Sequence, residues 1–131
     1  MSMLIKLFDS CGTGVWSVEL AREFPNSTFV GTDVTNIFAT SAMTAPTNCA
    51  FFEANVLNGL QFEDNSFDFV FQRAQTSCFN MESWPGILKE LMRVTKPGGY
   101  IELREYPCSL GVNLLIKSIT TLGLPLKTLI Y

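Results

Sequence analysis

The sequence lacks histidine altogether and has few charged residues. Charged residues make up 16% of its 131 residues, against about 25% in an ordinary soluble domain. Without histidine, the chain cannot carry an imidazole-based hydrolytic triad, and its cysteines lack the partners of a common zinc site. Nine basic and twelve acidic residues give a net charge of −3, with no basic stripe. We therefore expect neither a resident metal nor a nucleic-acid partner.

Disulfide and membrane signals are also absent. The four cysteines form no Cys-x-x-Cys pair and are widely spaced, at Cys11, Cys49, Cys78 and Cys108. A chain of this length needs no covalent staples, so this spacing favours reduced thiols. No run approaches the roughly 18 apolar residues of a membrane span, and the longest candidate, Leu110–Leu126, is interrupted by Lys117 and Pro125. The start shows no signal-peptide pattern. We expect a cytoplasmic protein without a membrane span.

Apolar side chains are present in excess. Hydrophobic residues make up 47% of the chain, including eleven Phe, and this content excludes disorder. The length allows one domain, residues 1–131. So apolar a composition in so short a chain predicts a partial domain, one that belongs to a larger core.

Short apolar runs alternate with segments of helical periodicity, which is typical of βαβ units. Five strands are predicted, at Met3–Phe8, Thr28–Thr32, Cys49–Glu53, Phe67–Gln72 and Tyr100–Leu103. Helices are predicted at Val15–Phe24, at Asn36–Met43 and after Ser83. Right-handed crossovers then give an α/β fold, a doubly wound and mostly parallel sheet of five strands with helices on both faces.

The last predicted helix has the clearest signals. Ser83 is the expected N-cap, and Pro85 fits the first turn. An apolar stripe at helical spacing predicts the buried face, with Trp84, Ile87, Leu88, Leu91 and Met92. Lys96–Gly99 predicts a tight turn before the last strand. Three charged residues at the exit of that strand face either a substrate mouth or solvent: Glu102, Arg104 and Glu105.

The C-terminal segment, residues 106–131, is apolar and has Lys117 and Lys127 as its charges. Leu110–Leu122 has the length of a helix, but its apolar positions fall on more than one face. Such a helix needs partners on several sides, so the segment favours self-association.

A glycine-rich loop follows the first predicted strand, and it contains Ser10, Cys11, Gly12, Thr13 and Gly14. Glycine lets a ligand approach the backbone closely, and the free amides of a helix start suit a carboxylate or phosphate. Asp33 ends the second strand, where its carboxylate either accepts hydrogen bonds from a ribose or caps the helix predicted from Asn36. Because parallel strands share one carboxyl edge, the two features together predict a nucleoside-containing ligand there.

Four ordered motifs resemble the class I S-adenosylmethionine-dependent methyltransferases over residues 4–105. They are Cys11–Gly14, Phe29–Asp33, Phe67–Val70 and Arg93–Tyr100. The resemblance implies a Rossmann-like methyltransferase core that binds S-adenosyl-L-methionine at the carboxyl edge of its sheet. It also implies methyl transfer to an unidentified acceptor, a small molecule or a protein. Transfer from a sulfonium is an in-line displacement, which needs alignment more than an acid or a metal.

The resemblance also implies cofactor-binding residues at matching positions. Gly12 and Gly14, within the loop that starts at Ser10, would line the methionine part of the cofactor. Asp33 would hold the ribose, and Val34 would pack near the adenine.

Four further positions follow from the third and fourth strands. Asn55, with Val56 beside it, stands where the family usually places an Asp that contacts the adenine amino group. The amide oxygen of Asn55 can still accept that hydrogen bond. Gln72 and Arg73 would border the methyl-transfer site. No catalytic residue is assigned.

The chain departs from the family pattern at several points. The loop of the family usually has an acidic residue, one spacer residue and then Gly-x-Gly-x-Gly. Here Ser10 stands at the first glycine position, and Asp9 is one residue too close to Gly12. Either a loop residue is missing or Phe8 occupies the acidic position. The helical segment before the first strand and the final strands of the family are also missing, so we expect a domain truncated at both ends.

Two other functions compete with methyl transfer. The chain could be a catalytically inactive, truncated fragment that acts as a binding or interaction module. A nicotinamide dinucleotide binder shares the sheet, but Val15–Ser17 supplies no third glycine for its loop. Asp68 is expected to be a structural hydrogen-bonding partner rather than a base, and no cation stands beside Cys11 to lower its pKa.

Overall fold

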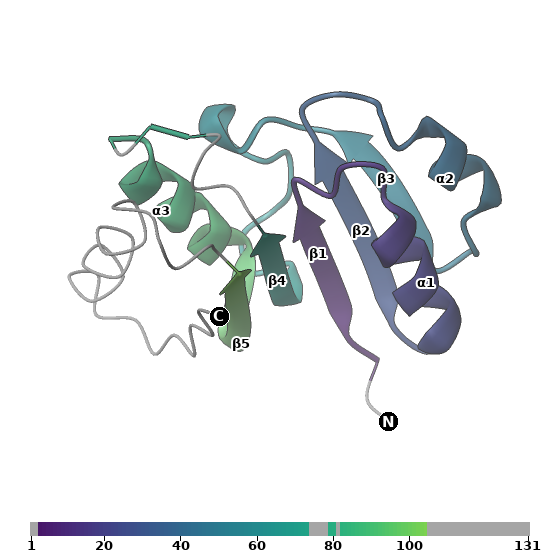
Figure 1. Cartoon of the computed structure of the whole chain (residues 1–131). Coiled ribbons are helices and arrows are strands. Elements are labelled where there is room, and N and C mark those ends of the chain that lie inside the picture. The colour runs from purple at the N-terminus through teal and green to yellow at the C-terminus, as the bar shows by residue number, and fades with distance from the viewer. Residues whose placement is uncertain (1–2, 74–78, 81, 105–131) are drawn as a thin grey trace.

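The computed structural model describes residues 3–73, 79–80 and 82–104, and the C-terminal segment 106–131 lies outside them. The described part consists of alternating strands and helices (Figure 1). In chain order they are β1 (Ile5–Asp9), α1 (Val15–Glu23), β2 (Thr28–Asp33), α2 (Ala39–Thr44), β3 (Cys49–Glu53), the 3₁₀ turn η1 (Val56–Asn58), β4 (Phe67–Arg73), α3 (Trp84–Val94) and β5 (Thr95–Arg104).

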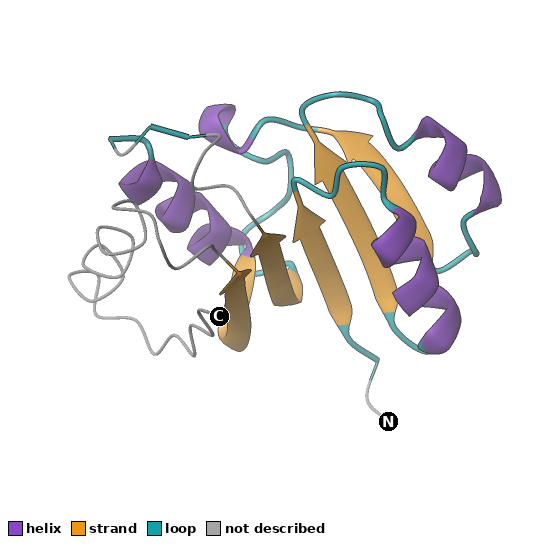
Figure 2. Ribbon diagram, in the orientation of Figure 1, coloured by secondary structure: helices purple, strands orange, loops and turns teal. Residues whose placement is uncertain are grey.

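The described strands form one sheet with the order β3-β2-β1-β4-β5 (Figure 2). All four neighbouring pairs are parallel. The order therefore reverses between β1 and β4, and the carboxyl edge at this point is where open α/β sheets bind ligands. The predicted doubly wound α/β sheet with helices on both faces is confirmed.

Successive residues of a strand face opposite sides of a sheet, and the two sides of this sheet have different cores. Leu7 packs with Val70 and with the apolar stripe of α3. Phe8 packs with Phe29, Phe71 and Ala21 of α1. We call these the α3 face and the α1 face.

The apolar stripe predicted for α3 is confirmed for Trp84, Ile87, Leu88 and Leu91, which are buried, whereas Met92 is only partly buried against the same core. Ser83 stands at the predicted N-cap position and Pro85 lies in the first turn, but the side chain of Ser83 does not cap the helix. The Ser83 side chain accepts no hydrogen bond from the helix backbone; its hydroxyl donates instead to Asn80 Oδ1 at 2.6 Å.

The tight turn predicted at Lys96–Gly99 lies inside β5 rather than before it. Phe67 pairs with Thr95, and Phe69 pairs with Tyr100, so Lys96–Gly99 bulges opposite the single residue Asp68. Asp68 accepts a hydrogen bond from the Ile5 amide at 2.8 Å and pairs with Lys96 at 3.2 Å. Its structural role is thereby confirmed.

The Phe51 ring of β3 closes the α1 face near the glycine-rich loop. It stacks on Phe38 with ring centroids 5.3 Å apart. A Cβ added to Gly31 would lie 2.5 Å from this ring, and one added to Gly14 would lie 2.4 Å from it. Two glycines therefore make room for one aromatic side chain.

We expect Gly31→Ala to lower the free energy of unfolding by about 1–3 kcal/mol, the usual cost of overpacking. Urea unfolding followed by circular dichroism measures the change. Gly86→Ala on α3 is the matched control, because a Cβ there meets no atom within 4 Å and alanine favours helix. Phe51→Leu should restore part of the loss, and a Gly31→Ala variant as stable as the Gly86→Ala variant would contradict the packing.

Candidate functional site

The loop between β1 and α1 has an unusual backbone. Ser10, Gly12 and Gly14 all have positive φ, at 55°, 60° and 75°. For a serine this conformation costs about 1–2 kcal/mol. The loop is anchored by the Cys11 amide, which donates to the Thr32 carbonyl at 2.8 Å.

Asp33 holds the same loop from the end of β2. One carboxylate oxygen accepts the Gly12 amide at 2.9 Å, and the other accepts the Thr35 amide at 3.2 Å. Asp33 does not cap the next helix, because α2 begins only at Ala39. The structure thus brings the loop and Asp33 together, although they are far apart in sequence.

Asp9 is a site residue that the sequence analysis did not select. It is 3% exposed, and its carboxylate accepts hydrogen bonds from Gln72 Nε2 at 2.7 Å, from Thr32 Oγ1 at 3.0 Å and from Ser10 Oγ at 3.4 Å. Burial raises the pKa of Asp9, although these hydrogen bonds oppose the shift. Its position at the end of a buried strand, just before a glycine-rich loop, is the sequence feature that could have identified Asp9 as a site residue.

The structure distinguishes between Phe8 and Asp9 as the acidic position before the loop. Phe8 lies in the aromatic cluster of the α1 face, 5.2 Å from the Trp16 ring. Asp9 faces the loop and Gln72. The geometry therefore fits a loop that is one residue short, with Asp9 at the acidic position.

A cleft of about 380 Å³ opens at this edge of the sheet. It is lined by Asp9, Ser10, Asp33, Val34, Ala54, Asn55, Val56, Leu57 and Phe79. Val34 and Leu57 leave 62% and 51% of their surfaces exposed, which gives the cleft apolar walls. A Cβ added to Gly12 would meet no atom within 4 Å, so space is open above the loop.

Asn55 and Val56 each have a second role besides lining the cleft. The Asn55 side chain caps η1 by accepting the Leu57 amide at 3.0 Å, and its oxygen keeps a second lone pair for a ligand. Val56 is largely buried in the core beneath α3.

The other predicted site residues lie around the cleft rather than on its wall. Gln72 is fully buried beneath it, and among the described residues its Oε1 has no hydrogen-bond partner. Arg73 lies on the α1 face, with its guanidinium carbon 5.5 Å from the centre of the Trp16 ring. Gly14 packs on Phe51, and Thr13 is exposed.

The thiols near the loop are poor nucleophiles. Burial raises the pKa of Cys11 to about 12, and the negative charge of Asp33 adds to the effect. Burial alone raises the pKa of Cys49 to about 11. Cys78 and Cys108 lie outside the described residues.

Within the described ranges, no cluster of three or more metal-ligating side chains occurs. The same part of the chain contains no helix with the length and apolar character that a membrane crossing requires.

Residues 10–99 match the family described as methyltransferase domain. The secondary metabolism regulator laeA of Coprinopsis cinerea is 33% identical over 96 residues, which are 73% of this chain and 23% of that protein. The protein-methionine methyltransferase laeA of Emericella nidulans is 29% identical over 100 residues, 72% of this chain and 24% of that protein. The chain thus spans about a quarter of the length of these relatives.

Solved structures share the fold. The PH0226 protein of Pyrococcus horikoshii has a TM-score of 0.67 at 26% identity, covering 76% of this chain and 48% of that one. Phosphoethanolamine N-methyltransferase 1 of Haemonchus contortus, solved with phosphoethanolamine and S-adenosylhomocysteine, has a TM-score of 0.69 at 19% identity. That match covers 83% of this chain and 23% of the other, and at this identity it shows the fold alone.

We expect Asp9→Asn to change how stability depends on pH. The pKa of Asp9 is higher in the folded state than in the unfolded state. The contribution of Asp9 to the free energy of unfolding is therefore fully present below the unfolded pKa and is lost as pH rises through the folded pKa. An amide at this position does not ionise. The free energy of unfolding of Asp9→Asn should therefore rise, relative to that of the unmodified chain, from acid to neutral pH. Urea titrations across this range measure the difference, and parallel profiles would contradict the buried carboxylate.

We expect Cys11 and Cys49 to resist alkylation in the folded protein. A pKa of about 12 lowers the thiolate fraction of Cys11 near pH 8 by about three orders of magnitude relative to an ordinary thiol. Iodoacetamide labelling with peptide mapping by mass spectrometry follows each cysteine separately. In urea both should react at the ordinary rate, and rapid labelling of Cys11 without urea would show that its thiol is not desolvated.

Proposed function

The chain belongs to the class I S-adenosylmethionine-dependent methyltransferase domain family, and from this premise we propose that it binds S-adenosyl-L-methionine in the cleft at the carboxyl edge and transfers the methyl group to an acceptor. The observation that carries the proposal is the cleft at the reversal of strand order, where the positive-φ loop and Asp33 meet.

The residues of the cleft fit such a ligand in shape and polarity. Open space above Gly12 leaves room against the loop backbone. Asp33 supplies carboxylate oxygens for the ribose hydroxyls at the end of β2, while Val34 and Leu57 offer apolar surface for a base. The Asn55 side chain lies in the same cleft and gives hydrogen-bonding groups for the adenine edge.

The charges of the cleft also suit this cofactor. Asp33 lines it, and a carboxylate favours a ligand that carries positive charge. When bound, S-adenosylmethionine supplies an electrophilic methyl group on a sulfonium. The chain then contributes orientation, since in-line transfer needs alignment above all.

Gln72 supports the cleft from below. Asp9 accepts from its amide nitrogen, which fixes the direction of the amide group. Among the described residues the amide oxygen has no partner, and a buried acceptor of this kind favours a donor from a ligand or a water. Gln72 is therefore proposed as a positioning residue.

The acceptor class and the activity of the whole protein are also matters of proposal. The names of the laeA relatives include a protein-methionine methyltransferase, and this supports a protein as one acceptor class beside a small molecule. The alternative, a catalytically inactive binding module, predicts a chain whose behaviour does not depend on Asp33.

We expect Asp33→Ala to weaken the binding of S-adenosylhomocysteine about 10- to 100-fold, the effect of losing hydrogen bonds to a charged group. Isothermal titration calorimetry measures the affinity, and circular dichroism checks the fold.

Asp64→Ala is the matched control. Asp64 is 71% exposed in an ion pair with Arg93 and does not line the cleft, so its loss should leave the affinity unchanged. A folded, unmodified chain that binds neither S-adenosylmethionine nor S-adenosylhomocysteine would overturn the proposal, as would equal affinities of the two variants.

A further inference from the structure

The final residues of the strands divide the carboxyl edge by charge. In the spatial order β3-β2-β1-β4-β5, these residues are Glu53, Asp33, Asp9, Arg73 and Arg104. Three acids are followed by two arginines, and the sign changes between β1 and β4. This is also the place where the strand order reverses.

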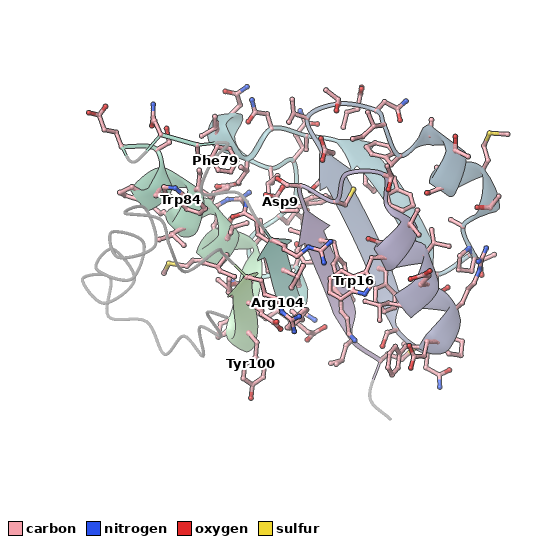
Figure 3. All side chains as sticks on the ribbon, in the orientation of Figure 1. Asp9, Trp16, Phe79, Trp84, Tyr100 and Arg104 are labelled. Atoms are coloured by element: carbon pink, nitrogen blue, oxygen red, sulfur yellow. The ribbon has the colours of Figure 1, made fainter. Side chains whose placement is uncertain are left out.

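The two arginines lie next to each other on one face. Arg73 and Arg104 are register partners of β4 and β5. Their guanidinium carbons lie 5.5 Å from the centre of the Trp16 ring and 5.9 Å from that of the Phe71 ring, which places both on the α1 face. Figure 3 labels Trp16 and Arg104 there. Among the described helices, α3 covers the opposite face of these strands.

Their surroundings hold the arginines in place. Arg104 Nε donates to Glu102 Oε1 at 2.5 Å. The Trp16 and Phe71 rings pack against each other, with their centroids 4.7 Å apart. Arg73 and Arg104 each make a further interaction as well. A guanidinium presents its N–H groups in one plane, which suits the two oxygens of a carboxylate or phosphate.

We propose that Arg73 and Arg104 form an oxyanion subsite for the methyl acceptor, so that the acceptor carries a carboxylate or phosphate group. The inference rests on the proposed function. The acidic half of the edge attracts a cationic cofactor and repels an anion, whereas the arginine half attracts an anion. Each substrate is thus directed to its own half.

Methyl transfer needs no reactant other than the acceptor and the cofactor. A lone pair of the acceptor forms the bond to the methyl carbon while the carbon–sulfur bond breaks, and the electron pair of that bond stays on sulfur. The arginines hold the anionic group of the acceptor and exchange no proton. They act on binding and orientation.

The subsite is tested by comparing the affinities of charged and neutral probes of similar shape. The chain is first titrated with S-adenosylhomocysteine, and this step alone decides the proposed function. Benzoate, phenyl phosphate and the neutral benzamide are then added to the saturated protein. Nuclear magnetic resonance follows the arginine Nε–H groups and the Trp16 indole N–H. We expect benzoate, phenyl phosphate or both to bind at least tenfold more tightly than benzamide.

Arg104→Gln should reduce the affinity for the bound anion at least tenfold. Arg22→Gln is the matched control, because Arg22 lies near the end of α1 and donates to the Thr44 carbonyl at 3.0 Å; it should leave the affinity unchanged. Equal binding of benzoate and benzamide, binding of none of the probes, or equal affinities of the two variants would overturn the subsite.

The same titration separates the acceptor from the cofactor as the source of the anion. Saturation with S-adenosylhomocysteine fills any subsite for the carboxylate of the cofactor itself. Anions that bind the saturated protein support an acceptor subsite. Anions that bind only the free chain would assign the arginines to the cofactor carboxylate and overturn the inference.

Discussion

Asp9 ends β1 inside the protein, and its carboxylate receives hydrogen bonds from both neighbouring strands, through Gln72 of β4 and Thr32 of β2. Because the strand order reverses between β1 and β4, this one carboxylate joins the two halves of the sheet where the cleft opens. A buried carboxylate without such donors would be costly, so carboxylate and donors fix one another. The next residue, Ser10, takes a positive φ, and the conformation of the glycine-rich loop follows from it.

The fold could be predicted from the sequence because it depends on local patterns. Apolar runs bounded by turn residues marked the strands, and helical spacing marked α3. The boundaries moved where the pattern was short or mixed. The helix expected from Asn36 begins at Ala39 and has no buried residue, so no apolar stripe located it. The glycines of Lys96–Gly99 indicated a turn, but pairing with β4 resumes on the same strand, and only the partner strand decides that.

The site was predictable in part. Asp33 and the loop were selected from local motifs, and the structure joins them through the Gly12 amide. Gln72 was expected at the methyl-transfer site, yet it is buried beneath the cleft, because it shares the α3 face with Val70 and lies beside Asp9. That placement depends on the register between strands that are far apart in sequence. Packing sets this register, and a linear motif does not contain it.

The alternation of side chains along a strand also explains why opposite charges persist side by side at the carboxyl edge. Asp9 has the parity of Leu7 and belongs to the α3 face, whereas Arg73 has the parity of Phe71 and belongs to the α1 face. The last residues of adjacent strands thus direct an acid and a base to opposite sides of one sheet. Asp33 has the parity of Phe29 and so shares the α1 face with the arginines. The acids and the arginines are therefore separated along the edge of the sheet, and Asp9 alone is also separated from Arg73 across it. A sheet of this topology can in this way offer separate places to a cationic and an anionic ligand within one small domain.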